Sequence, residues 1–217
     1  MGIGRTAVSI ATGYYHSCAV LDNGSIVCWG ADDQGQLGNG GLSTSDQSSP
    51  SIAVDLGVGR TAVTVTAGRD HVCALLDDGS VKCWGDDLEG QLGAGLNGNT
   101  NYNGFGYDSD VPTPVLLPTG RTAIAVEANY RHTCAILDDG SLTCWGSDWR
   151  GELGNGGSNT AIDYPSTNPI DLGTGRTAVA VSLGRAHTCA ILDNGDAKCW
   201  GWDLSLIHIS EPTRQPN

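Results

Sequence analysis

The sequence predicts an all-β protein that forms part of a β-propeller built from repeated blades. Gly-Arg-Thr-Ala recurs at 4–7, 59–62, 120–123 and 175–178, with steps of 55, 61 and 55 residues between its arginines. No window keeps a helical period, and 32 glycines and 8 prolines interrupt the chain. A unit of this length holds about four short strands, which suits one propeller blade, whereas a β-solenoid coil repeats in far fewer residues.

The first strand of each unit follows the Gly-Arg-Thr-Ala opener. Apolar, mostly β-branched residues stand at every second position there, a pattern typical of a strand with one buried face. We expect the buried positions to be Val8/Ile10, Val63/Val65, Ile124/Val126 and Val179/Val181.

A hairpin comes next in each unit. Its first strand carries His-x-Cys-Ala, and its return strand ends in Cys-Trp-Gly. Asp-Gly or Asn-Gly between two apolar runs is the strongest short hairpin signal, which predicts turns at 22–24, 77–79, 138–140 and 193–195. A polar loop then follows in three units, Gly-Gln-Leu-Gly at 35–38 and 90–93 and Gly-Glu-Leu-Gly at 151–154.

Together these segments read Gly-x-x-His-Thr-Cys-Ala-x-Leu-Asp-Asp-Gly-Ser-x-x-Cys-Trp-Gly, followed by Gly-Gln-Leu-Gly. This pattern resembles the repeat of the regulator of chromosome condensation family, in the cysteine-bearing form of bacterial secreted proteins. The resemblance implies a seven-bladed propeller, of which this chain would hold about three and a half blades. We therefore expect one propeller arc over 1–203, with repeats at 4–58, 59–119, 120–174 and, truncated, 175–203.

Both ends of the chain are expected to be artificial boundaries. Residues 204–217 have no counterpart in the other units and resemble a translated sequencing adapter, so we expect a non-native tail. The alternative is a genuine final strand over 204–209. Met1 aligns with Leu56 and Leu172 within the repeat, so a missing leader says nothing about export.

The eight cysteines form four pairs, each with nine residues between the partners. With the turn centred on Asp78, Cys73 and Cys83 face each other across the hairpin, close to disulfide range. Closing such a loop would stabilise the fold by about 2–3 kcal/mol. The predicted disulfides are Cys18–Cys28, Cys73–Cys83, Cys134–Cys144 and Cys189–Cys199. They place the protein outside the cell, at the cell surface or in the periplasm.

Reduced structural thiols and a metal site are the alternatives to disulfides. Each unit offers one histidine and two cysteines, but structural zinc takes four ligands and no Cys-x2-Cys pair is present. We expect no metal and no cofactor. The histidines that recur at one slot are predicted to be hydrogen-bonded structural residues, and the tryptophans after the second cysteine to pack inside: His16, His71, His132 and His187, and Trp29, Trp84, Trp145 and Trp200.

The formal net charge is −13, with only 11 lysines and arginines. A nucleic-acid-binding surface needs a basic stripe, and an anionic membrane would repel this chain. No apolar run approaches about 20 residues, the length of a membrane-spanning helix. We therefore expect neither a nucleic-acid partner nor membrane insertion.

Function in a propeller is expected in the loops that differ between blades. The loop over 93–113 makes its unit longer, 61 residues against 55, and it carries aromatic residues among asparagines and glycines. The candidate binding residues are Tyr102, Phe105 and Tyr107, with Trp149 and Arg150 as a second group. The alternative is that these rings fold back to close a compact Ω-loop.

No unique acid, base or nucleophile stands out, so we predict no enzymatic activity. The leading hypothesis is an exported module that binds a protein or a glycan through a propeller face. The resemblance offers two alternatives, a nucleotide-exchange factor for a Ran-type small GTPase and a secreted inhibitor of the β-lactamase type. An open arc would also leave edge strands free for self-association.

A related photoreceptor propeller has a tryptophan cluster with arginines at the two positions that precede the repeated histidine. This chain has other residues in those slots, so light sensing is not expected. They are Tyr14-Tyr15, Arg69-Asp70, Tyr130-Arg131 and Arg185-Ala186.

Overall fold

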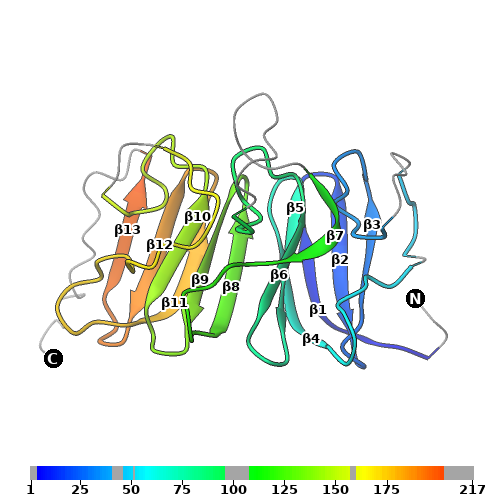
Figure 1. Cartoon of the computed structure of the whole chain (residues 1–217), viewed down its shortest axis with the longest axis horizontal. Helices are drawn as coiled ribbons and strands as arrows, with labels where there is room; N and C mark the ends of the chain where they lie inside the picture. The colour runs from blue at the N-terminus through cyan, green and yellow to red at the C-terminus, as the bar shows by residue number, and fades with distance from the viewer. Residues whose placement is uncertain (1–3, 41–45, 51, 96–107, 157–159, 203–217) are drawn as a thin grey trace, which may run out of the picture.

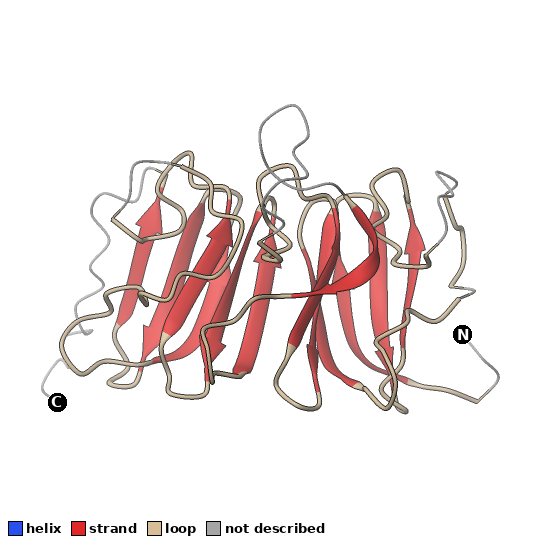
Figure 2. Ribbon diagram, viewed as in Figure 1, coloured by secondary structure: helices blue, strands red, loops and turns tan. Residues whose placement is uncertain are grey.

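The computed structural model describes residues 4–40, 46–50, 52–95, 108–156 and 160–202. Within these ranges the protein is all-β, with thirteen antiparallel strands and no helix (Figure 2). The strands form four sheets that stand side by side as blades of an incomplete propeller (Figure 1). The predicted fold class is therefore confirmed. The expected tail over 204–217 lies outside the described residues and stays a prediction.

Each sheet contains the three strands that the repeat predicts. The first sheet is β1 (Ala7–Thr12), β2 (His16–Leu21) and β3 (Ile26–Gly30). The second is β4 (Ala62–Ala67), β5 (His71–Leu76), β6 (Val81–Gly85) and a fourth strand, β7 (Ser109–Pro114). The third is β8 (Ala123–Asn129), β9 (His132–Leu137) and β10 (Leu142–Gly146), and the last is β11 (Ala178–Leu183), β12 (His187–Leu192) and β13 (Ala197–Gly201).

A full fourth strand forms in the second sheet of the described chain. In the first and third sheets, isolated bridges such as Val27–Ala53 and Gly146–Ile162 take its place. The outer side of each blade is therefore the least regular part of the repeat.

The predicted burial of the first strands is wrong at one position in every unit. Ala62 pairs with Leu76 and Thr64 pairs with Leu75, so Val63 is the extra residue of a β-bulge. The same bulge occurs at the equivalent residues, and all four are exposed at 58–65%: Val8, Val63, Ile124 and Val179. Alternating apolar residues predict which positions are buried only where the two paired strands keep a regular register without a bulge.

After the bulge, burial depends on the neighbouring sheet. Val65 and Val126 are buried as predicted, because each packs against the preceding sheet. Ile10 is 65% exposed, because its sheet has no preceding sheet among the described residues.

The hairpins pair the cysteines in the predicted way. Cys73 is the direct partner of Cys83 in the register of β5 and β6, and the other three pairs are equivalent. The structure joins all four pairs as disulfides, with Cα atoms 4.0–4.1 Å apart. Each disulfide therefore closes one hairpin inside one blade.

The repeated opener and the hairpin turn hold neighbouring blades together. Ala62 N donates to Gly24 O, and Ala123 N donates to Gly79 O, so each opener bonds to the turn of the preceding blade. Gly79 has a φ of 77°, and a Cβ there would strike the side chain of Thr122 in the next unit. These contacts explain why both segments repeat so closely.

The interior between blades is built from the repeated tryptophan and histidine. Trp84 and Trp145 are fully buried, and each indole N–H donates to a carbonyl of the preceding unit, 3.0 Å away. His71 Nε2 lies 3.0 Å from Thr133 Oγ1 of the next blade, and His132 Nε2 lies 3.1 Å from Thr188 Oγ1. The packing role predicted for these four residues is confirmed.

His16 departs from this pattern because the next unit has Val72 at the threonine position. Its ring is buried and neither nitrogen has a hydrogen-bond partner within the described residues. Burial lowers the pKa of His16 to about 4, and the nearby charge of Asp33 opposes that shift only in part. His187, in the last described sheet, is exposed.

Candidate protein-interaction site

One end of the sheets collects the loops that differ most between units. Each first strand runs to this end, where a short loop leads to the histidine that begins the second strand. The return strand comes back to the same end, so the loop after Cys-Trp-Gly also lies there. In Figure 1 these loops are at the top, and the hairpin turns are at the bottom.

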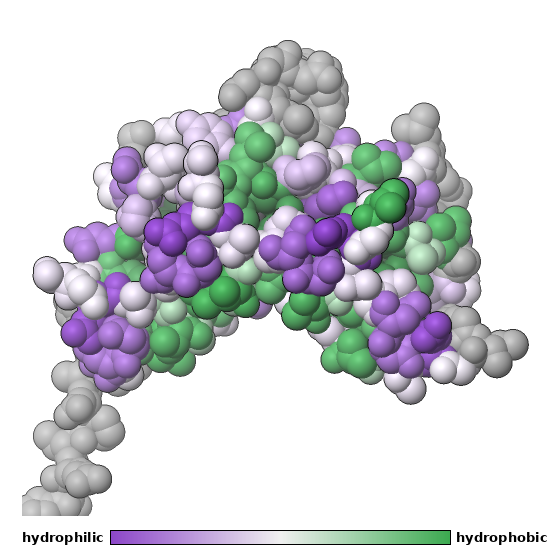
Figure 3. Space-filling model, turned by 60° about the horizontal axis from the view of Figure 1, so that its bottom comes forward, coloured by the Kyte–Doolittle hydropathy of each residue, from purple (hydrophilic) through white to green (hydrophobic). Residues whose placement is uncertain are grey.

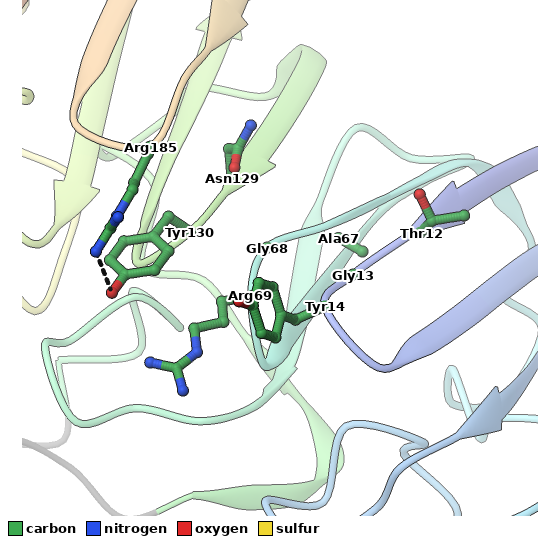
Figure 4. Close-up of a pocket in the computed structure, with 9 residues that line it drawn as sticks. All are labelled: Thr12, Gly13, Tyr14, Ala67, Gly68, Arg69, Asn129, Tyr130 and Arg185. Atoms are coloured by element: carbon green, nitrogen blue, oxygen red, sulfur yellow. Dashed lines mark hydrogen bonds between the residues drawn. The ribbon is translucent and has the colours of Figure 1, made fainter.

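A line of alternating tyrosine and arginine residues crosses this end over four successive blades. Tyr14 N donates to Arg69 O at 3.0 Å, and Arg69 N donates to Tyr130 O at 2.8 Å, so the loop backbones are bonded to one another. The side chains follow in the same order (Figure 4). We call Tyr14, Arg69, Tyr130 and Arg185 the Tyr–Arg row.

Stacking joins the side chains of the Tyr–Arg row. The Arg69 guanidinium carbon lies 5.6 Å from the centre of the Tyr14 ring and 5.8 Å from that of Tyr130. Arg185 lies 4.8 Å from the centre of the Tyr130 ring, and its Nη2 donates to the Tyr130 hydroxyl at 3.5 Å. All three guanidinium-to-ring distances are within the range of cation–π attraction. The row lines a cavity of about 540 Å³.

The third unit departs from the repeat at the centre of the row. The other units have glycine before the variable pair (Gly13, Gly68 and Gly184), where a Cβ would overlap the ring of the following histidine. Here Asn129 extends β8, and its Nδ2 donates to Leu183 O at 2.7 Å. Tyr130 then takes a φ of 41°, the one positive φ outside glycine among the described residues. Backbone strain of this kind often marks a functional position.

A second cavity, of about 330 Å³, adjoins the row and shares Tyr130 and Arg185 with it. Tryptophans and arginines from the last two described blades form its walls. We call it the Trp pocket, defined by Glu89, Arg131, Trp149, Arg150, Glu152 and Trp202. Trp149 and Trp202 are 67% and 56% exposed, which is unusual for so large an apolar side chain.

The two acids of the Trp pocket are bonded within it. Glu89 lies 3.4 Å from Arg131 and accepts a hydrogen bond from Trp149 Nε1 at 3.1 Å. Glu152 accepts from the Ser147 hydroxyl at 2.8 Å and from Arg150 N at 2.6 Å. The Arg150 side chain stacks 5.1 Å from the centre of the Trp202 ring. Glu89 is therefore paired with a cation, whereas Glu152 is held by neutral donors and keeps its charge beside the three arginines of the pocket, Arg131, Arg150 and Arg185.

The charge of this end changes from one side to the other. On the side of the first two blades, burial and then the neighbouring Asp86 raise the pKa of Asp108 to about 6. In the row, the hydrogen bond from Arg185 and the surrounding guanidinium groups lower the pKa of Tyr130. The acidic side therefore faces the first blades, and the cationic side faces the last ones.

The loops after Cys-Trp-Gly are shaped by aspartates. Leu37, Leu92 and Leu153 each donate their backbone N–H to the aspartate five residues earlier, at 2.9–3.0 Å. Burial raises the pKa of one of these carboxyls, that of Asp87, to about 7. Turn formation accounts for these acids, and no group of three or more His, Cys, Asp or Glu within the described ranges could hold a metal ion.

The structure describes two of the five predicted binding residues. Trp149 and Arg150 lie in the Trp pocket. Tyr102, Phe105 and Tyr107 lie outside the described residues, so their role stays a prediction. The sequence analysis did not assign Tyr130 or Arg185 to a site. The sequence does contain a signal for them: the two residues before each repeated histidine differ between units, whereas the residues on either side of that pair are largely repeated.

Comparison with known proteins gives the family. A model of the regulator of chromosome condensation (RCC1) repeat matches residues 7–36, 62–91, 123–151 and 178–205. A second model of the same repeat matches 23–75 and 78–136. The chain belongs to the RCC1 repeat family. The variable loop residues of the Tyr–Arg row lie within or between these matched segments.

Related proteins support the same fold. Protein pim1 of Schizosaccharomyces pombe is 28% identical over 170 residues, which is 75% of this chain and 31% of pim1. Human WBSCR16 superposes with a TM-score of 0.77 at 22% identity, covering 91% of this chain and 47% of that one. Yeast RCC1 (Prp20), solved with Kap60 bound, gives a TM-score of 0.74 at 21% identity, covering 93% and 45%. The chain thus spans less than half the length of each of these three proteins.

Helices that could cross a membrane were also sought. Among the residues that the structure describes, no helix has the length and apolar character that spanning requires.

Proposed function

We propose that this chain is a non-catalytic binding module that holds a partner protein at the end carrying the Tyr–Arg row and the Trp pocket. The observation that carries this proposal is the gathering of tyrosine, tryptophan and arginine side chains on the loops that differ between units. These three residue types dominate binding hot spots in protein interfaces. The yeast RCC1 propeller bound to Kap60 supports a protein as the class of partner.

We also propose that the module works outside the reducing cytosol. The four disulfides support this, because such bonds persist in oxidising compartments. Nucleotide exchange on an intracellular GTPase would need the reduced protein, so the disulfides count against that alternative. The protein is purified without reductant and then unfolded for a thiol assay. We expect no free thiol, and eight free thiols would contradict export.

A capture experiment tests the binding proposal. The oxidised chain is immobilised beside two variants, Tyr130→Ala/Trp149→Ala at the candidate site and Arg60→Gln at the opposite end. Proteins of the extracellular medium are passed over all three and identified by mass spectrometry. We expect a partner that the wild type and the Arg60→Gln variant retain and the double variant loses. A partner retained equally by all three would contradict this site.

A further inference from the structure

The Trp pocket and the adjoining row hold two arginines without an acidic partner. Arg150 stacks on Trp202, and Arg185 stacks on Tyr130, but neither forms an ion pair within the described residues. The nearby Glu89 pairs with Arg131, and Glu152 accepts hydrogen bonds from the Ser147 hydroxyl and the Arg150 backbone N–H but forms no ion pair with either guanidinium group, so three arginines face two acids in this pocket. Two exposed guanidinium groups are therefore available to a ligand.

The rest of the chain makes this arrangement unusual. The protein has 24 acidic residues and only 11 basic ones, and six of the eight arginines that the structure describes form an ion pair. At the hairpin end each opener arginine pairs with its own turn aspartate, as Arg60 does with Asp77 at 3.4 Å. Arg150 and Arg185 instead lie over aromatic rings and form no ion pair within the described residues.

This geometry fits a carboxylate better than a point cation or a neutral group. A guanidinium presents a planar fork of N–H donors that matches a carboxylate in a bidentate manner. Stacking on Trp202 and Tyr130 already restricts both arginine side chains, so less conformational entropy is lost when they bind. The exposed faces of Trp149 and Trp202 offer apolar area beside the cations.

We propose that the Trp pocket binds an acidic segment of a partner protein. A carboxylate of the segment lies between Arg150 and Arg185, and an aromatic or aliphatic neighbour packs on Trp149 and Trp202. The inference rests on the proposed function and adds the chemistry of the ligand. The two cavities share Tyr130 and Arg185 in their walls, so an extended peptide bound in the Trp pocket would continue toward the Tyr–Arg row.

The acidic side of the same end determines where the acidic residues of the bound segment can lie. Asp33, Asp70, Asp86 and Asp108 interact with one another on the side of the first two blades. A carboxylate placed there would be repelled. The acidic residues of the segment therefore lie over the last two described blades, and neutral or basic residues follow toward the first two.

Random peptides displayed on phage test this inference without a known partner. The library is selected in parallel on the oxidised wild type, on Arg150→Gln/Arg185→Gln and on Arg60→Gln/Arg121→Gln, a control with two arginines of the opposite end. Selected peptides are then synthesised and titrated against all three. We expect peptides enriched in Asp and Glu beside an aromatic residue, with affinity at least roughly tenfold weaker for the site variant and unchanged for the control. Arg185→Lys should recover only part of the loss, because lysine keeps the charge but not the planar fork.

Three outcomes would overturn the inference, and they also separate it from the proposed function. Peptides that need the site but carry no acidic excess would leave the binding function standing and refute the ligand chemistry. A heparin tetrasaccharide that binds through Arg150 and Arg185, when no peptide does, would replace the peptide with an acidic glycan. If the selected peptides bind the Arg150→Gln/Arg185→Gln variant and the Tyr130→Ala/Trp149→Ala variant as tightly as the wild type, both proposals are refuted.

Discussion

The two ends of the propeller use the same residue type in different ways. At the hairpin end, Arg5, Arg60, Arg121 and Arg176 belong to the repeated opener, and each pairs with an aspartate of its own turn at 3.3–3.5 Å. Figure 3 brings this end forward and shows its hydrophilic side chains in separate clusters. At the other end, arginines stand at positions that vary, and they stack on tyrosine and tryptophan rings.

The difference shows how repetition separates structure from function in this chain. An arginine that recurs in every unit meets the same aspartate each time, so its role is local and structural. An arginine at a position that varies between units meets side chains from other blades, up to 61 residues away in sequence, as Arg69 meets Tyr130. Variable positions at a shared end are therefore where a binding surface can arise without disturbing the blades.

The largest expected effect concerns the repeated scaffold. Cys73→Ala/Cys83→Ala removes one disulfide from the second blade, and we expect the free energy of unfolding to fall by about 2–3 kcal/mol. Thermal or denaturant unfolding of the oxidised proteins measures this. An unchanged midpoint would mean that the repeated cysteines are not part of the stabilising scaffold.

Two opposite substitutions at the blade interfaces are expected to have smaller effects on the free energy of unfolding. Val72→Thr would give His16 the hydroxyl partner that His71 already has, and we expect a gain of about 1 kcal/mol. Thr133→Val removes that partner from His71 and leaves a buried ring nitrogen unpaired, at a cost of about 1–3 kcal/mol. Denaturant unfolding of both variants checks the signs. If both variants change stability in the same direction, the histidine network does not act as described.

Replacing one arginine at each end of the propeller is expected to change the free energy of unfolding still less. Arg60→Gln breaks exposed ion pairs with Asp77 and Asp78, and we expect a loss of about 0.2–1 kcal/mol that shrinks at high salt. Arg185→Gln breaks no ion pair within the described residues, so its unfolding should depend on salt as the wild type does. A larger loss for Arg185→Gln than for Arg60→Gln would assign Arg185 a structural role.

The smallest expected effect is a shift in one titration. Arg185 donates to the Tyr130 hydroxyl, and with its neighbours it lowers the pKa of that group. In an ultraviolet absorbance titration, the signal lost in Tyr130→Phe should ionise below the ordinary range of a tyrosine. Arg185→Gln should raise the Tyr130 pKa toward the ordinary value. A Tyr130 titration that is the same with and without Arg185 would show that the contact between Arg185 and Tyr130 is not formed in solution.

Much of the fold could be predicted from the sequence because its determinants are local. Strand alternation, the Asp-Gly turns and the cysteine spacing lie within one unit, and together they fix the hairpin register. The β-bulge at Val63 could not be predicted, because an extra residue leaves the apolar pattern unchanged. The exposed stacking of Tyr130 and Arg185 depends on how successive blades sit beside one another, which a single unit does not encode.

The candidate site was only partly predictable for the same reason. Trp149 and Arg150 are adjacent in sequence and stood out beside a repeated loop. Arg69, Tyr130 and Arg185 come from three units and meet only when the loops line up at one end. A comparison of equivalent slots across units, read for the positions that vary, would have brought them together.

Amide hydrogen exchange of the chain with and without a captured partner or selected peptide tests the central claim most directly. We expect slower exchange over 129–131, 147–150 and 184–186, where the Tyr–Arg row and the Trp pocket lie. The turns at 22–24, 77–79, 138–140 and 193–195 should exchange as before. Protection confined to those turns would contradict the claim that the variable end is the binding surface.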